Sequence, residues 1–205
     1  MKVLKATKTN ITTAAETVKK GGLVIYPTET VYGLGCDPLN IDAVQQLLTV
    51  KSERNKPLPI LASGISEVDK IAFISSKGRQ LATRFWPGPL TMVFPKKPVL
   101  PDVVTFGWDS VGLRIPCNDV ALDLIRLAGG LLVGSSANIS GEAPPRAVQE
   151  LSRELKSMVD VILDCGATVH GMPSTVADLT SENPKILRKG PVSLQELLDA
   201  LAFGD

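Results

Sequence analysis

Short apolar runs alternate with amphipathic stretches along this chain, and glycine, proline or asparagine bounds most of them. The clearest run, Leu23 to Pro27, follows two glycines and is rich in strand-forming residues. A short apolar run between turn residues is typical of a buried strand. Comparable runs predict further strands over residues 58–62, 90–94, 110–116, 131–134 and 159–163.

The stretches between these runs carry the helical period. Asn40 is positioned to cap a helix whose apolar face carries Ile41, Val44, Leu47 and Leu48. Asn10 before an amphipathic run, with glycines after it, predicts a first helix over residues 11–20. The same signals predict helices over residues 75–85, 118–128 and 147–155.

The last predicted helix opens with a capping box formed by Ser193 and Glu196. Its inward face is expected to carry Leu194, Leu197, Leu198 and Leu201. Before it, residues 95–109 form a proline-rich loop with two aromatic residues, which is either a packed loop or a lid over a site.

Strands and helices alternate over the whole chain without a linker or a break in composition. This predicts a single domain over residues 1–205. The expected class is α/β, with a twisted mixed sheet of parallel and antiparallel strands, helices outside it and an open concave site. The chain is 44% hydrophobic and 21% charged, as expected for a globular protein.

Charge and cysteine content narrow the function classes. The net charge of +1 provides no global basic field for nucleic acid, so an anionic ligand needs a local cluster of cations. Three cysteines far apart and one histidine argue against a disulfide framework and a zinc site. No apolar leader or membrane-length apolar run is present, so we expect a cytoplasmic protein without a membrane partner.

Polar residues follow two of the predicted core strands. Thr28, Glu29 and Thr30 come after the first, and residues 135–138, Ser-Ser-Ala-Asn, after the second. Hydroxyls, an amide and a carboxylate at strand ends suit a small-molecule site, although one such stretch alone is equally an ordinary polar turn. Two of them in one chain favour the site.

Three cations, Lys51, Arg54 and Lys56, lie within six residues ahead of the strand at 58–62. They form either a solvated helix end or an anion clamp, and the pattern alone favours the helix end. The phosphate-binding loop G-x-x-x-x-G-K-[ST] is absent, and the glycines at 33 and 35 lack the third glycine of the dinucleotide fingerprint. Any nucleotide must therefore be held by another cradle.

The residues 27–34, Pro-Thr-Glu-Thr-Val-Tyr-Gly-Leu, resemble the hallmark of the YrdC-type threonylcarbamoyl-AMP synthase family. Trp-Pro-Gly-Pro-Leu-Thr at 86–91, Ser-x-Asn at 136–138, Ser-Thr-Val at 174–176 and Leu-Arg-x-Gly-Pro at 187–191 are similar to further family segments. The resemblance extends over nearly the whole chain.

The resemblance implies an adenylyltransferase. Such an enzyme forms L-threonylcarbamoyladenylate and pyrophosphate from L-threonine, bicarbonate or CO2, and ATP, and the product feeds threonylcarbamoyladenosine modification of tRNA. Transient contact with the downstream tRNA-modifying machinery is implied as well. Mg2+ is expected to arrive with ATP, without protein ligands.

The resemblance also assigns residues. Lys51 and Arg54 take the place of a Lys-x-Arg motif on the ATP phosphates and are the predicted catalytic pair, although they stand three apart instead of two and Lys56 could share their work. The L-threonine contacts implied are Thr28, Arg114, Ser136 and Ser174. The nucleotide contacts implied are Lys51, Arg54, Ser110, Asn138, Arg146 and Arg188.

Two other function classes stay open. One is an RNA-binding module, which the near-neutral charge disfavours. The other is a carbamoyl-adenylate-forming enzyme that uses carbamoyl phosphate, as in hydrogenase-maturation proteins of the same fold type. The acylphosphatase-like and zinc-finger segments of those proteins are not found in this sequence.

Overall fold

The computed structural model describes residues 2–51, 56–139 and 141–202. Its strands and helices confirm the predicted α/β class. The strands form two mixed sheets, however, where a single sheet was expected. The first sheet runs in the order β1 (Lys2–Lys5), β9 (Val161–Asp164), β2 (Val24–Tyr26), β3 (Gly33–Gly35) and β8 (Ser135–Ser136). Its first three strands are parallel, and β3 and β8 are antiparallel to their neighbours.

The second sheet has six strands within the described residues. Its order is β11 (Lys185–Arg188), β10 (Thr175–Asp178), β5 (Leu90–Pro95), β6 (Ser110–Arg114), β4 (Ile60–Ala62) and β7 (Leu131–Val133). The β10–β5 and β4–β6 pairs are parallel, and the other pairs are antiparallel. The chain therefore crosses repeatedly between the two sheets.

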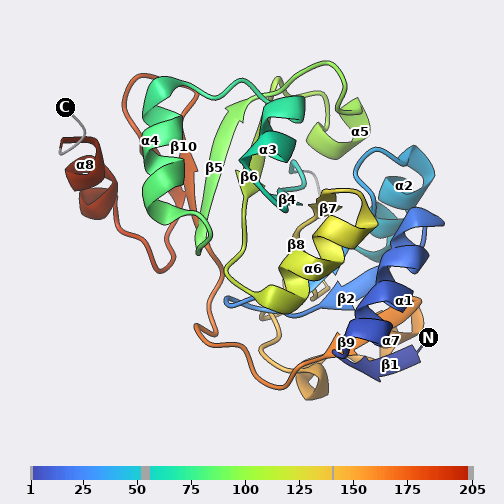
Figure 1. Cartoon of the computed structure of the whole chain (residues 1–205). Helices are drawn as coiled ribbons and strands as arrows, with labels where there is room; N and C mark the ends of the chain where they lie inside the picture. Colours follow the sequence, from blue (N-terminus) through green and yellow to red (C-terminus); the bar gives the residue numbers. More distant parts are fainter. Residues whose placement is uncertain (1, 52–55, 140, 203–205) are drawn as a thin grey trace.

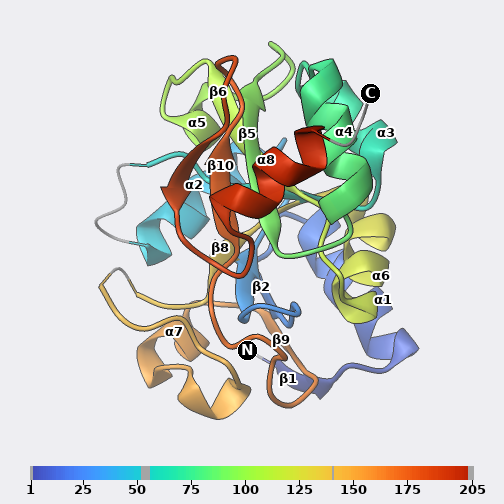
Figure 2. The same ribbon diagram turned by 90° about the vertical axis from the view of Figure 1, so that its left-hand side faces the viewer.

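Helices cover the outside of both sheets (Figure 1). Helices α1 (Lys8–Lys19) and α6 (Asp119–Ala128) lie side by side and bury a small apolar cluster against β2. Helix α8 (Leu194–Ala202) runs beside α4 (Ser76–Phe85) next to β10 (Figure 2). The remaining helices are α2 (Ile41–Val50), α3 (Ile65–Ile71), α5 (Asp102–Thr105), the 3₁₀ turn η1 (Val148–Glu150) and α7 (Arg153–Ser157).

Most predicted helix caps are confirmed. The side chains of Asn40 and Asn118 accept the backbone N–H groups that open α2 and α6. Ser75, expected as the first residue of its helix, is instead the residue whose side chain caps α4. Ser193 and Glu196 exchange the hydrogen bonds of a capping box. These caps depend on contacts three residues away, which is why the local sequence predicts them.

Two helix predictions are wrong in detail. Thr7, not Asn10, caps α1, because the Thr7 hydroxyl accepts the N–H of Asn10 while the Asn10 amide donates to the carbonyl of Lys5. The helix expected over residues 147–155 is a 3₁₀ turn followed by α7. Ser152 interrupts it, since its hydroxyl accepts the N–H of Leu155 and starts a new helix there.

Helix α8 turns less of its leucine face inward than expected. Leu197 is fully buried and Leu201 is partly buried, but Leu194 and Leu198 are 42% and 43% exposed. The helix is held mainly along one line against α4, so the outer leucines remain at the surface.

The loop over residues 95–109 is packed. It contains α5, and its own residues Leu100, Val104 and Thr105 are buried, whereas Trp108 is exposed. Within the part of the chain that the structure describes, no helix combines the length and apolar character needed to cross a bilayer.

Candidate functional site

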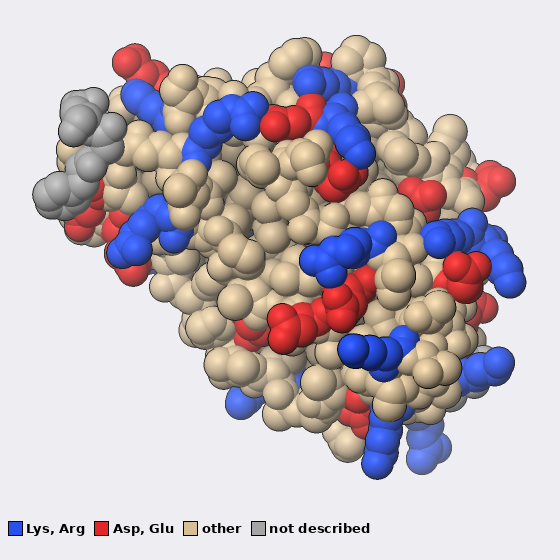
Figure 3. All heavy atoms as spheres, viewed as in Figure 1, with Lys and Arg blue, Asp and Glu red and all other residues tan. Residues whose placement is uncertain are grey.

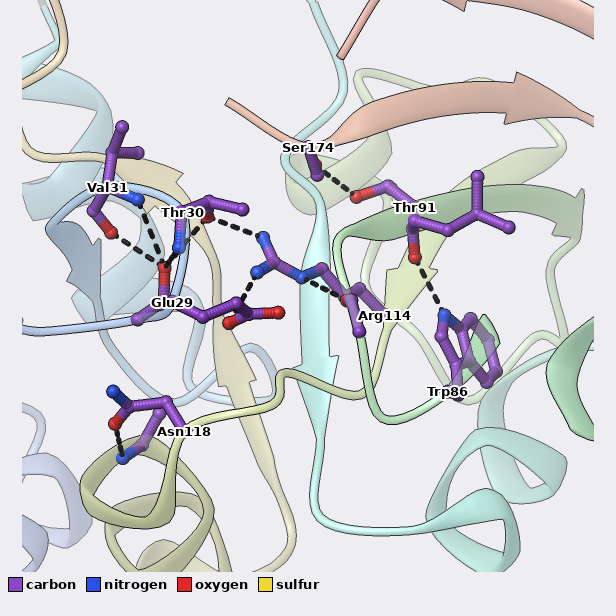
Figure 4. Close-up of polar contacts among 12 residues, drawn as sticks. Glu29, Thr30, Val31, Trp86, Thr91, Arg114, Asn118 and Ser174 are labelled. Atoms are coloured by element: carbon purple, nitrogen blue, oxygen red, sulfur yellow. Dashed lines mark hydrogen bonds and ion pairs between the residues drawn. The ribbon is translucent and has the colours of Figure 1, made fainter. Parts of the chain in front are cut away.

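Arg114 stands at the end of β6 and connects the two sheets (Figure 4). Its Nε donates to the carbonyl oxygen of Gly88 at 2.9 Å, and its Nη1 donates to the hydroxyl of Thr30 at 3.0 Å. The side chain is only 6% exposed. Two segments far apart in the sequence therefore fix one buried guanidinium.

Glu29 is the ionic partner of this arginine (Figure 4). Its Oε2 lies 2.7 Å from Arg114 Nη2, and its side chain is 7% exposed. The approach lies outside hydrogen-bond geometry, so the attraction is mainly coulombic. Among the described residues, neither Glu29 oxygen nor Arg114 Nη2 has a hydrogen-bond partner.

The loop after β2 is ordered by its own hydroxyls. The Thr28 hydroxyl oxygen accepts the N–H groups of Thr30 and Val31 and lies 2.8 Å from the Thr30 hydroxyl. All three of these residues are buried. A polar loop can be buried in this way because its backbone donors are satisfied within it.

Ser174 and Thr91 form a second hydroxyl pair, at 2.8 Å, where β10 lies beside β5. Arg188 clamps this pair from β11: its Nε and Nη2 donate to the Ser174 carbonyl, and Nη2 also donates to the Ser174 hydroxyl. Although Arg188 as a whole residue is exposed, partial burial of its guanidinium, and then the positive charge of Arg114, lower the pKa of Arg188.

Lys51, at the end of α2, holds the polar turn after β8. Its ammonium donates to the carbonyl oxygens of Ser136 and Asn138 and to Oδ1 of Asn138. The Ser136 hydroxyl donates to the same Oδ1, and the Asn138 amide donates to the carbonyl of Glu142. Lys51 is 3% exposed, so this cation is part of the interior and not of a solvated helix end.

Tyr32 links the loop after β2 to the turn after β8. Its backbone carbonyl accepts the N–H of Ala137, between Ser136 and Asn138, and its hydroxyl donates to the carbonyl of Gly166. Burial raises the pKa of Tyr32 to about 12. The loop that carries Thr28 and Thr30 is thus bonded to the turn that carries Ser136 and Asn138.

One face of β6 is only half-buried over Ser110 and Gly112. Val111 and Leu113 are fully buried on one side of the strand, whereas Ser110 and Gly112 on the other side are half-buried and share their face with Arg114. A Cβ atom at Gly112 would lie 3.2 Å from the Thr91 methyl and 3.8 Å from the Pro59 Cβ. Ser110 and Arg114 thus share a face, as predicted, at opposite ends of β6.

The other predicted cations lie at the periphery. Arg146 is exposed, and its guanidinium packs against the backbone of Gly171. Lys56 is exposed, and the prediction for Arg54 falls outside the described residues. Figure 3 shows one face of the molecule, on which basic and acidic side chains are intermixed.

Four residues of the site have no role assigned by the sequence motifs: Glu29 and Thr30, expected only as polar loop residues, and Gly88 and Thr91. All four contact predicted threonine residues, Arg114 or Ser174. The signal available was the motif at residues 27–34, which contains a carboxylate between two threonines. An open cavity of about 700 Å³ lies elsewhere, between α4 and α8, and contains no predicted site residue.

The arrangement of these motifs is shared with known proteins. The model of the Sua5, YciO and YrdC proteins, described as "Telomere recombination", matches residues 16–190. The chain belongs to the Sua5/YciO/YrdC family. Its motifs at 27–34, 86–91, 136–138 and 174–176 all lie inside the matched range, and the motif at 187–191 does so except for its last residue.

Two relatives of this family member are named threonylcarbamoyl-AMP synthase. The protein of Pyrococcus abyssi is 40% identical over 186 residues, and that of Bacillus subtilis is 35% identical over 190 residues. They cover 90% and 91% of this chain, which spans 55% of the length of each. The crystal structure of P. abyssi Sua5 complexed with L-threonine matches with a TM-score of 0.94 at 36% identity, over 100% of this chain and 61% of that one.

Proposed function

We propose that this protein is an L-threonylcarbamoyladenylate synthase, an adenylyltransferase that acts on L-threonine, bicarbonate or CO2, and ATP. The observation that carries the proposal is the buried Arg114 cluster, which has the donors for an amino-acid carboxylate in a chain whose relatives bear this name. The P. abyssi protein that was crystallised with L-threonine shares the fold over the whole chain.

Threonine is proposed to lie against Arg114, Ser174 and Ser136. Arg114 has five N–H donors, and Gly88 and Thr30 accept two of them, so a planar carboxylate can take a pair of the others. Ser174 is held by Arg188 and Thr91, and Ser136 by its bond to Asn138. Thr28 contributes by ordering the loop that carries Thr30.

The nucleotide is proposed to lie over the half-buried face of β6, from Ser110 across Gly112. We propose that the Asn138 turn, fixed by Lys51, contacts the nucleotide as well, and that the positive charges of Lys51 and Arg188 offset phosphate charge. Arg54 and Arg146 are proposed as further phosphate contacts. Mg2+ is proposed to enter with ATP as its phosphate-bound companion; the described residues contain no group of three or more His, Cys, Asp or Glu placed to hold a metal.

The reaction needs positioning more than a side-chain nucleophile. The amine of threonine adds to CO2 and loses a proton to give a carbamate. A carbamate oxygen then attacks the α-phosphorus of ATP, and pyrophosphate leaves. Holding the two substrates in line and neutralising the leaving pyrophosphate are the contributions that buried cations and ordered loops provide. The product is an activated donor for tRNA modification.

Pyrophosphate release from ATP in bicarbonate buffer, with and without L-threonine, tests the proposal. We expect release that needs threonine and that L-serine supports poorly. Absence of release from folded, ATP-binding protein would contradict the proposal. Carbamoyl phosphate in place of threonine and bicarbonate then tests the sister chemistry.

A further inference from the structure

Glu29 and Arg114 form a buried ion pair that leaves both partners short of hydrogen bonds. Their side chains are 7% and 6% exposed, and Oε2 lies 2.7 Å from Nη2. Within the described residues, however, Oε1, Oε2 and Nη2 have no hydrogen-bond partner. Buried polar groups are nearly always paired, and an unpaired one is costly, so this arrangement calls for an explanation.

The backbone around the pair is fixed, so the missing bonds do not reflect a loose loop. The N–H of His170 donates to the carbonyl of Glu29 at 2.8 Å, and the hydroxyl of Thr28 accepts the N–H of Thr30. Arg114 is anchored through Nε and Nη1. Both side chains are therefore preorganised, and two of the three unpaired atoms, Oε2 and Nη2, lie 2.7 Å apart.

A free acceptor beside a free donor, both charged and both buried, matches a ligand that carries the two opposite charges close together. An α-amino acid has its carboxylate and its ammonium on neighbouring carbon atoms. Arg114 suits the carboxylate, and Glu29 then lies within reach of the ammonium. A hydroxy acid or an N-acylated amino acid matches only half of this arrangement.

We propose that Glu29 accepts the α-ammonium of the amino-acid substrate while Nη2 of Arg114 donates to its carboxylate. The inference rests on the proposed function and adds a specificity residue to its threonine site. Because both groups are buried, the amino acid enters by replacing the direct ion pair with two contacts to itself. Glu29 then selects for a free α-amine, the group that must form the carbamate.

A salt bridge with a purely structural role predicts something different. In that case Glu29 only holds Arg114 in place, and its loss weakens every carboxylate ligand alike. If Glu29 contacts the ammonium, its loss weakens only ligands that have one. L-Threonine and (R)-3-hydroxybutanoate, which keeps the carboxylate and hydroxyl but lacks the amine, separate the two roles.

The experiment measures dissociation constants of both ligands by NMR titration, which reaches millimolar values, on the full chain without ATP. For the wild type we expect threonine to bind about 10-fold to 100-fold more tightly than 3-hydroxybutanoate, as for a charge-assisted hydrogen bond. For Glu29→Gln we expect this preference to disappear through weaker threonine binding alone. Glu16→Gln, an exposed carboxylate on α1 paired with Lys19, is the matched control and changes neither constant.

Equal weakening of both ligands by Glu29→Gln would overturn the inference, as would unchanged threonine binding. If Glu29→Gln does not fold, the wild-type comparison still decides, because equal affinity for the two ligands refutes contact with the ammonium. If the wild-type protein binds 3-hydroxybutanoate and threonine equally well, the carboxylate site of Arg114 stands and only the proposed role of Glu29 is refuted. If the wild-type protein binds neither ligand, both the proposed function and this inference are refuted.

Discussion

Lys51 donates to both carbonyl oxygens of Asn138, one in the backbone and one in the side chain. A third donation reaches the carbonyl of Ser136, so one ammonium organises the whole turn after β8. The cation that the sequence placed at a helix end is therefore buried against the turn after β8. Lys51 therefore supplies a positive charge and also fixes the shape of the turn.

Lys51→Ala should weaken ATP binding far more than threonine binding. The substitution removes a buried positive charge and one donor to each oxygen of Asn138, although the Ser136 hydroxyl still donates to Oδ1, and this loosens the predicted nucleotide side of the site. We expect at least about a 10-fold rise in the dissociation constant for a non-hydrolysable ATP analogue by calorimetry. Lys20→Ala, at the exposed end of α1, is the control; equal loss of both ligands would indicate misfolding or a wrong assignment.

Arg188→Lys should raise KM for threonine about 10-fold. Arg188 holds Ser174 through a fork of two nitrogens, and a single ammonium cannot reproduce that geometry. Steady-state kinetics with threonine and ATP varied separately provides the measurement. Lys185→Ala, also exposed on β11, should change neither KM. A rise confined to KM for ATP would place Arg188 on the nucleotide alone.

Local sequence predicted much of the fold because many of its signals act over three or four residues. The caps at Asn40 and Asn118 and the box at Ser193 are of this kind. The start of α1 was misplaced because Thr7 and Asn10 are both good caps, and only a contact with the carbonyl of Lys5 decides between them.

The candidate site was predictable in composition and not in contacts. Polar strand ends and the family motifs identified Arg114, Ser174 and Lys51, and the structure places all three among buried polar partners. The role of Glu29 was not visible, because a carboxylate in a loop looks solvated until its partner is known. Arg114 donates to Thr30, the residue next to Glu29, and the two lie 84 positions apart in the sequence. No local pattern reports a contact of that separation.

Tyr32→Phe should flatten the loss of stability at high pH. Burial raises the pKa of Tyr32 to about 12 in the folded protein, above its usual 10.0, so the folded state favours the neutral phenol. The resulting stability is fully present below about pH 10 and is lost as the pH rises towards about 12. Urea unfolding at several pH values should give a smaller fall for the variant.

The same variant should be less stable at neutral pH, by about 1 kcal/mol. The Tyr32 hydroxyl donates to the carbonyl of Gly166 and accepts the N–H of Cys165, and phenylalanine can do neither. Burial also raises the pKa of Tyr26, but that residue is present in both proteins, so the difference between them reports Tyr32. Parallel pH curves would contradict the prediction.

Gly112→Val should block the nucleotide and leave threonine binding intact. The new side chain would project from the half-buried face of β6, where its Cβ lies 3.2 Å from the Thr91 methyl, and its two methyl groups would occupy the surface between Ser110 and Arg114. Valine suits a strand, and the fold should tolerate it after a small shift of the Thr91 methyl, which the Cβ would approach too closely. Calorimetry should show a dissociation constant for the ATP analogue raised at least about 10-fold and an unchanged dissociation constant for threonine.

Gly64→Val is the matched control, since a Cβ there meets only the Ser66 hydroxyl, at 3.9 Å, and the backbone is extended. Threonine binding lost with ATP binding kept would put the amino acid, and not the nucleotide, over the middle of β6.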